Sequence, residues 1–156
     1  MTDNASIIRR FYDAFAKTDA LTMGRCYADH VVFSDPVFPR LKGEEARAMW
    51  RMLCARSKDF SLSYDGVEAD EHSGKVRWVA HYTFSKTGRS VENIVNATFR
   101  FANGAIIEHT DRFDFWRWSR QALGAAGLLL GWTSSLQRKA QGTAAQSLAE
   151  YLSTQS

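Results

Sequence analysis

Cysteine is scarce in this sequence, and its pattern excludes two classes of protein. Among 156 residues there are two cysteines, Cys26 and Cys54, and four histidines. Both cysteines fall at apolar positions of predicted helices, where a free thiol behaves as a small buried hydrophobe in a reducing compartment. The sequence therefore excludes a disulfide-stapled secreted domain and a Cys/His zinc cluster.

Long hydrophobic runs and a strong net charge are missing as well. The longest weakly polar stretch, residues 122–132, is far shorter than the roughly 20 residues that span a bilayer. The first six residues have neither the charged start nor the apolar centre of a signal peptide. The formal charge of +3 is small and dispersed, unlike the clustered basic surface of a nucleic-acid-binding protein. We therefore expect a cytoplasmic protein whose partners include neither a membrane nor a nucleic acid.

Helical spacing of apolar residues dominates the first third of the chain, and the 45% hydrophobic composition is sufficient for the core of one domain. One apolar stripe consists of Ile7, Ile8, Phe11, Ala14 and Phe15. Asn4 or Ser6 would cap this helix, and Asp19 would cap a short second helix. A third amphipathic pattern covers residues 43–57. Three helices are thus predicted before any long strand.

From Phe60 onward the apolar period changes from 3.6 to 2, which predicts β-strands. A short strand over 31–33 precedes this change and ends at Asp35-Pro36. Turns are predicted at Ser73-Gly74, Thr87-Gly88 and Asn103-Gly104. Two further helical patterns cover residues 117–130 and 136–152. Helices followed by an antiparallel meander predict an α+β fold with the helices packed on one face of a curved sheet.

The predicted strand at 107–115 interrupts its own apolar face with two polar residues. Side chains alternate along a strand, so His109 and Asp111 share the face of Ile107, Phe113 and Phe115. An uncompensated charge on a core face is strongly unfavourable. His109 and Asp111 either satisfy each other inside a wet core or line a cavity that admits water or a ligand.

Three stretches carry a resemblance to a known family. Residues 7–19 (IIRRFYDAFAKTD) and 26–36 (CYADHVVFSDP) resemble the opening of the nuclear transport factor 2-like superfamily, and 104–114 (GAIIEHTDRFD) resembles the last strand of its SnoaL-like members. The resemblance implies a cone-shaped, curved antiparallel sheet with three N-terminal helices on its concave face. It places the NTF2-like domain at residues 1–116 and a C-terminal helical extension of the same domain at 117–156.

The ketosteroid isomerase branch of that superfamily is matched in one catalytic position only. Asp35 matches the proton-shuttling base of that branch, but Phe11 and Ala97 stand where its two oxyanion donors belong. Loss of one such donor typically costs about 2.7 to 4 kcal/mol of barrier height. The neighbouring Tyr12 is expected to point in the wrong direction on its helix. The resemblance therefore argues against the steroid-isomerase mechanism.

Other branches give Asp111 a role. It matches the final-strand carboxylate of limonene epoxide hydrolases, although the Arg and Asp that complete their triad have no counterpart here. SnoaL-type cyclases also use a carboxylate in this cavity as acid or base. The resemblance thus implies that Asp111 is a general acid or base, that His109 shares its proton, and that Asp35 is a second carboxylate across the cavity. Asp35 also fits a purely structural Asp-Pro turn.

Further candidate site residues follow from their predicted inward positions. Tyr82 and Asn93 are candidate polar contacts for a ligand. An apolar cavity wall is predicted from the aromatic residues Trp50, Trp78, Phe11, Phe15, Phe99 and Phe113, which fit a plain core equally well. His109 and Asp111 supply only two metal ligands, and a catalytic zinc site takes three. With no Gly-rich phosphate loop in the sequence either, we expect neither a metal nor a cofactor.

Three hypotheses on function remain open from the sequence. The first is a cofactor-independent hydrolase, isomerase or cyclase that acts on a small hydrophobic molecule. The second is a non-catalytic module that binds a ligand or a partner. The third is a homodimeric subunit paired through the outer face of its sheet, and it is compatible with the other two. That face is predicted to carry Val79, His81, Ile94, Asn96, Thr98, Glu108 and Thr110.

Overall fold

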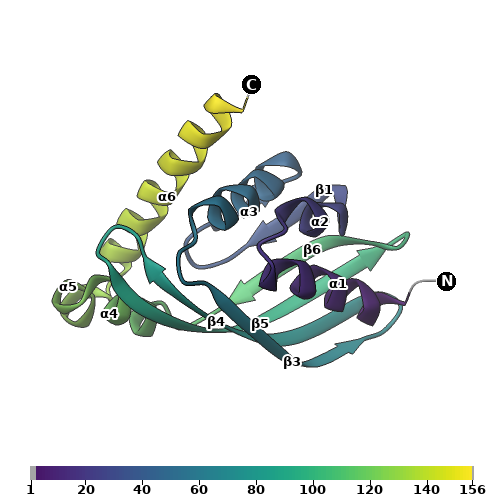
Figure 1. The fold of residues 1–156 in the computed structure, drawn as a ribbon, viewed down its shortest axis with the longest axis horizontal. Helices are drawn as coiled ribbons and strands as arrows, with labels where there is room; N and C mark the ends of the chain where they lie inside the picture. Colours follow the sequence, from purple (N-terminus) through teal and green to yellow (C-terminus); the bar gives the residue numbers. More distant parts are fainter. Residues whose placement is uncertain (1–2, 156) are drawn as a thin grey trace.

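The fold is a six-stranded curved sheet with helices on its concave side and at one end (Figure 1). The computed structural model describes residues 3–155. Its helices are α1 (Asn4–Ala16), α2 (Ala20–Arg25), α3 (Glu44–Arg56), α4 (Phe115–Leu123), α5 (Ala125–Leu130) and α6 (Ser134–Thr154). Its strands are β1 (Tyr27–Ser34), β2 (Leu41–Lys42), β3 (Ser61–Ala69), β4 (Ser73–Phe84), β5 (Arg89–Ala102) and β6 (Ala105–Arg112). The α+β fold expected from the sequence is confirmed.

The order of strands in the sheet is β2-β1-β6-β5-β4-β3. Neighbouring strands are antiparallel except β1 and β6, which run parallel. The parallel pair joins the beginning of the chain to its last strand, and its register sets Phe33 opposite His109. Because of this pairing, residues from the first quarter of the chain lie beside the polar interruption of β6.

Helix α1 packs its apolar stripe onto the concave face of the sheet. The predicted stripe is buried, and Tyr12 is buried with it. The expected caps were wrong: the carboxylate of Asp3 accepts from the Ser6 amide at 2.7 Å, while the Asn4 side chain bonds backbone carbonyls at Asp70 and Glu71. A carboxylate at this position accepts a hydrogen bond from an amide that lacks a partner within the helix, and its negative charge interacts favourably with the helix dipole. Asp19 caps α2, as predicted.

The β-hairpins mostly follow their turn residues. Asn103 and Gly104 both have positive φ, the backbone that a two-residue hairpin with matched twist requires. The turn predicted at Ser73-Gly74 lies earlier, because β4 already begins at Ser73. Gly74 serves packing instead: a Cβ there would lie 2.8 Å from Ile8 Cδ1. The glycine thus lets α1 approach the sheet closely.

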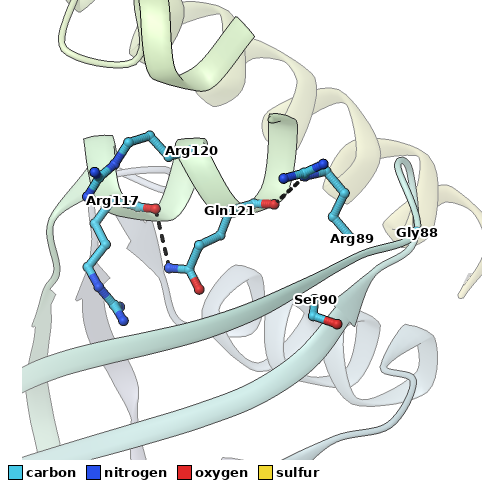
Figure 2. Close-up of a pocket in the computed structure, with 6 residues that line it drawn as sticks. All are labelled: Gly88, Arg89, Ser90, Arg117, Arg120 and Gln121. Carbon is cyan, nitrogen blue, oxygen red and sulfur yellow. Dashed lines mark hydrogen bonds between the residues drawn. The ribbon is translucent and has the colours of Figure 1, made fainter. Parts of the chain in front are cut away.

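The chain leaves the sheet after β6, and α4 takes the place of a longer strand. The predicted helix over 117–130 is broken at Gly124, whose φ of 67° ends α4 and starts α5. Arg89 reaches from the β4–β5 turn to the Gln121 carbonyl at the end of α4 (Figure 2), with Nε donating at 2.7 Å. Because the last carbonyls of a helix lack internal partners, this contact fixes α4 against the hairpin.

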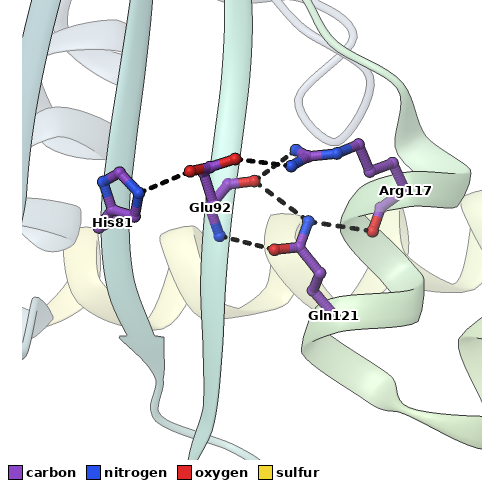
Figure 3. A network of polar contacts seen from close by, with 4 residues as sticks. All are labelled: His81, Glu92, Arg117 and Gln121. Atoms are coloured by element: carbon purple, nitrogen blue, oxygen red, sulfur yellow. Dashed lines mark hydrogen bonds and ion pairs between the residues drawn. The ribbon is translucent and has the colours of Figure 1, made fainter.

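Side chains of α4 also pair the free edge of β5. The side-chain amide of Gln121 accepts from the Glu92 backbone N–H at 2.7 Å and donates to the Glu92 backbone carbonyl at 3.1 Å. Arg117 donates to the same carbonyl at 2.6 Å and to the Glu92 carboxylate at 2.8 Å. The Glu92 carboxylate also bonds His81 (Figure 3). An unpaired strand edge invites association with other chains, and α4 covers this one.

Helix α6 returns along the molecule to α3 (Figure 1). Leu148 is buried against the core, and the side chains of Gln137 and Gln141 both donate to the carbonyl of Pro36, at 3.1 and 3.0 Å. The C-terminal helix therefore braces the loop that follows Asp35. Within residues 3–155, no helix combines the length and the apolar character that crossing a bilayer requires.

Candidate functional site

A polar chain of four side chains lies in the middle of the apolar core. The Trp50 indole N–H donates to the Tyr27 hydroxyl at 2.8 Å, and this hydroxyl lies 2.7 Å from His109 Nδ1. His109 Nε2 lies 2.8 Å from Asp111 Oδ1. An indole only donates, so the Tyr27 proton is free to bond Nδ1, and Nε2 then carries the proton that bonds Asp111. A neutral imidazole and an ionised carboxylate satisfy every member of this chain.

The His109 ring is enclosed by aromatic rings on all the elements around it. It is fully buried, and its centroid lies 4.4 Å from Phe99, 5.0 Å from Phe33 and 5.4 Å from Phe11. Trp50 stacks nearly parallel to it at 6.2 Å. Aromatic rings therefore surround the imidazole, which holds Asp111 by a hydrogen bond from inside the core.

Asp111 keeps one carboxylate oxygen free. Its Oδ1 accepts from His109 and lies 3.5 Å from the Trp78 indole nitrogen. Its Oδ2 has no hydrogen-bond partner among residues 3–155, and it is not among the fully enclosed polar atoms that lack one. The side chain as a whole is only 3% exposed. Oδ2 is therefore the oxygen of Asp111 that remains available for a further hydrogen bond.

Tyr12 points toward His109 and Asp111, contrary to the direction expected from the sequence. Its hydroxyl lies 3.4 Å from His109 Nε2, and its ring packs against Trp78 and Phe99. The prediction that it points the wrong way was incorrect, because the buried stripe of α1 is wide enough to include two adjacent residues. Burial raises the pKa of Tyr12 well above its usual value, and the charge of Asp111 adds to this effect. The Tyr12 hydroxyl therefore stays protonated.

Asp35 lies just beyond the end of β1, partly buried. Its Oδ1 accepts from the amides of Val37 and Phe38 at 2.7 and 2.5 Å, so the predicted Asp-Pro turn exists. Burial raises the pKa of Asp35 to about 7; the negative charge of Asp111 acts in the same direction and the amide bonds oppose it. The turn therefore anchors a carboxyl group whose pKa is raised, and a chemical role for Asp35 stays a prediction.

Tyr82 and Asn93 lie on the inner faces of β4 and β5. The Trp118 indole donates to the Tyr82 hydroxyl at 2.8 Å. Burial raises the pKa of Tyr82 to about 12, the Trp118 bond opposes this, and the charge of Asp35 adds to it. Asn93 lies opposite Ala80 of β4 and is 8% exposed. Asp35, Asp111 and Tyr82 therefore share one electrostatic neighbourhood.

The predicted aromatic wall is found mainly as tightly packed core. Trp50, Phe11 and Phe99 contact the His109 ring, while Phe15 and Trp78 contact each other at 5.4 Å between centroids. Phe113 is partly buried against the same cluster. These rings exclude water from the carboxylates, which strengthens every electrostatic interaction among them. Whether they also touch a ligand stays a prediction.

Sequence reasoning missed Tyr27, Trp118 and the direction of Tyr12. Tyr27 follows the short second helix in the sequence; it starts β1 and reaches His109 from the neighbouring strand. No local pattern indicates this, since it depends on the β1–β6 pairing. Trp118 falls in a helix whose position on the sheet depends on the edge contacts of α4.

Two cavities on the surface lie away from these carboxylates. One of about 720 Å³ is lined by Gly88, Arg89, Ser90, Arg117, Arg120 and Gln121 (Figure 2). Another of about 470 Å³ lies between α2, α3 and the start of β1. Neither is lined by Asp35, His109 or Asp111. In the described part of the chain, no group of three or more His, Cys, Asp or Glu is arranged to hold a metal ion.

Comparison with known proteins agrees with this architecture. The profile of the SnoaL-like domain family matches residues 8–109. No curated protein sequence matches the chain. An NTF2-like protein of unknown function from Burkholderia pseudomallei superimposes with a TM-score of 0.68 at 22% identity, covering 78% of this chain and 98% of that one.

Two further solved structures carry functional descriptions. An LEH-like epoxide hydrolase from M. tuberculosis gives a TM-score of 0.64 at 20% identity, over 80% of this chain and 93% of that one. A putative polyketide cyclase from Xanthomonas campestris gives 0.63 at 20% identity, over 74% and 93%. At these identities the similarity shows a shared fold.

Proposed function

Since the chain belongs to the family of SnoaL-like domains, within the NTF2-like superfamily, we propose that it binds a small hydrophobic molecule and transforms it by acid/base catalysis without a cofactor. The reaction class is hydrolysis, isomerisation or cyclisation. The LEH-like epoxide hydrolase and the putative polyketide cyclase that share the fold support these classes.

The observation that carries this proposal is a pair of carboxyl groups in different surroundings. Asp35 is held by two backbone amides, and burial together with the Asp111 charge raises its pKa to about 7. Asp111 accepts from His109 through Oδ1, and its Oδ2 has no hydrogen-bond partner among residues 3–155. Two titratable groups in different environments are the usual basis of an acid and base assignment.

The roles follow from the free atoms. Asp111 takes a proton through Oδ2, from water in a hydrolysis or from a carbon acid in an isomerisation or cyclisation. Asp35 gives its proton to the substrate oxygen on which negative charge develops. Tyr82, whose pKa is raised to about 12, stays protonated and donates a hydrogen bond to the same oxygen. The chain from Trp50 through Tyr27 and His109 holds Asp111 in place.

A turnover assay on a panel of epoxides, enones and polyketide-like compounds tests this proposal. Asp111→Asn and Asp35→Asn should each lower kcat by about 10²- to 10⁴-fold, the usual contribution of a positioned acid or base. Turnover should also fall as the pH rises above about 7, because Asp35 then loses its proton. Asp70→Asn, a change in an exposed turn, is the matched control. Unchanged turnover in Asp111→Asn would contradict the assignment.

A second candidate is a non-catalytic module that binds a ligand. The mutual satisfaction of His109 and Asp111 inside an aromatic core favours it, because such a pair also stabilises a pocket without reacting. The melting temperature separates the two candidates. A ligand-induced rise in Tm that persists in Asp111→Ala, with no turnover of the same compound by the wild-type protein, supports the binding module.

The outer face of the sheet is proposed as a homodimer interface. Val79 and Ile94 are directly opposed across β4 and β5 on this face, and both are half-buried. Polar and charged side chains surround them, which is the usual arrangement of an apolar interface centre and a polar rim. Dimerisation is compatible with either function.

A further inference from the structure

The last three residues of helix α5 and the two residues after it form an exposed apolar tip, residues 128–132. The exposed fractions are 52% for Leu128, 68% for Leu129, 52% for Leu130 and 72% for Trp132. The tip lies at one extreme end of the molecule, beyond the end of the sheet (Figure 1). Leucines of a folded chain are rarely this exposed in an unbroken run, and such a patch marks an interaction site.

The segment around the tip is basic and free of acidic residues. Between residues 115 and 149 the sequence has four cations, Arg117, Arg120, Arg138 and Lys139, and no Asp or Glu. Arg138 and Lys139 are exposed in the second turn of α6. The β4–β5 turn adds Lys86 and Arg89, and it is tied to α4 by the Thr87 hydroxyl, which donates to the Ala122 carbonyl at 2.5 Å. The tip is thus surrounded by positive charge.

The cavity of about 720 Å³ opens beside this tip. No acidic side chain lines it, and three of its six lining residues are arginines (Figure 2). Arg117 is paired with Glu92, whereas Arg89 and Arg120 have no ion pair among residues 3–155. The Arg120 guanidinium lies 4.5 Å above the Trp116 ring, and the Trp116 indole donates to the Leu128 carbonyl. Cavity and tip are therefore parts of one surface.

We propose that this end of the protein docks on the surface of an anionic phospholipid bilayer. Leu128, Leu129, Leu130 and Trp132 enter the boundary between headgroups and acyl chains, where leucine and tryptophan side chains are favoured. The surrounding cations face the lipid phosphates, and the arginine-lined cavity accommodates a headgroup. Basic residues near an anionic membrane surface strengthen binding, each by a similar increment.

Charge decides between a membrane and a second copy of the chain. Two copies paired through this tip would bring cation against cation, which opposes association. The tip is also a single short helix, small for a stable protein interface. This proposal departs from the sequence-based expectation of no membrane partner. That expectation rested on the lack of a spanning segment and of strong net charge, and neither reason applies to a local tip that lies in the interface.

Co-sedimentation of the full chain with vesicles tests the proposal. We expect binding at low salt to vesicles of phosphatidylcholine mixed with phosphatidylglycerol, weaker binding to phosphatidylcholine alone, and a loss of binding as salt screens the charges. The double variant Leu129→Ser with Trp132→Ser should lower partitioning by about tenfold or more, because it removes two apolar side chains from the interface. Leu21→Ser is the matched control, since Leu21 is 64% exposed on α2.

A charge series makes the test sharper. The double variant Arg138→Gln with Lys139→Gln should weaken binding to the anionic vesicles but not to phosphatidylcholine vesicles. The control is Arg9→Gln with Arg10→Gln, two arginines that are also adjacent and exposed on a helix, and it should bind anionic vesicles like the wild type. Thermal melts establish that each variant is folded. Wild-type protein that stays in solution at low salt, or tip variants that bind like wild type, would overturn the proposal. So would a dimer in vesicle-free solution that Leu129→Ser dissociates, because the tip would then bind a second copy.

Discussion

The hydroxyl of Tyr27 is the single group on which the buried polar chain depends. It accepts from Trp50 and bonds His109 Nδ1, and all three side chains are enclosed. Tyr27→Phe keeps the ring and leaves two buried polar atoms without partners, so the free energy of unfolding should fall by about 2 to 4 kcal/mol. Urea unfolding measures this loss.

Tyr64→Phe is the matched control for that experiment. The Tyr64 hydroxyl makes one exposed hydrogen bond, to Asp13, so its loss should change the unfolding free energy by about 0.5 kcal/mol or less. If Tyr27→Phe is as stable as Tyr64→Phe, water replaces the hydroxyl and the core around His109 is wetter than the structure implies.

Asp35 and Asp70 make the same local contacts with opposite electrostatic results. Each carboxylate accepts from the amides two and three residues further along the chain. In the exposed Asp70 these bonds lower the pKa. In Asp35 burial and the Asp111 charge outweigh them and raise the pKa to about 7. Position in the fold, and not the turn motif, therefore decides which carboxyl is useful as an acid.

This contrast predicts the pH dependence of stability. The folded chain holds the Asp35 proton between the usual pKa of 3.8 and about 7, so the unfolding free energy falls as the pH rises through that window. Asp35→Asn should remove this fall. Asp70→Asn should act oppositely, because it removes a contribution that is present above the ordinary carboxyl pKa and lost on acidification. Urea unfolding from pH 2 to 8 covers both windows, because the Asp70 contribution changes only below the ordinary carboxyl pKa of 3.8. Identical slopes between pH 4 and 7 for Asp35→Asn and wild type would refute the assignment.

At the scale of elements, α4 replaces a strand that the sheet lacks. β6 ends opposite Asn96, and the first half of β5 is paired on that side by Arg117 and Gln121. Gln121→Ala should expose the Glu92 amide, raising its hydrogen-exchange rate by about tenfold for one lost hydrogen bond. Gln146→Ala, on the exposed face of α6, is the control. An unchanged exchange rate at Glu92 would mean that α4 holds the edge without Gln121.

Elements with a strong repeating pattern could be predicted from the sequence, and contacts between them could not. The period-two stretch over β5 predicted its inner face, and Val95, Ala97 and Phe99 are buried as expected. The break at Gly124 was missed, because a single glycine is tolerated inside many helices and only its positive φ ends this one. Gly74 was assigned to a turn, whereas the close approach of Ile8 explains it.

For the whole molecule, the site is assembled from parts that no local window contains. His109 and Asp111 were visible in the sequence because they break an apolar alternation within one strand. Tyr27 becomes their neighbour only through the parallel β1–β6 pair, which lies outside the meander pattern. The two glutamines of α6 reach the Asp35 loop from more than one hundred residues away. Local periodicity thus indicated His109 and Asp111, and it did not indicate the residues that hold them.

The outer sheet face gives a prediction for the assembly of the molecule. Val79 and Ile94 lie at its centre, and the ion pair between Arg100 and Glu108 lies on its exposed surroundings. If two copies pair here, Ile94→Arg places a charge in the apolar centre of the interface and should weaken the dimer by about tenfold or more. Leu21→Arg adds the same charge to an exposed leucine on α2 and should leave the dimer intact. Sedimentation velocity at micromolar concentration measures the dimer of both variants. A wild-type chain that sediments as a monomer rules out this interface, because the proposed face would then not pair in solution.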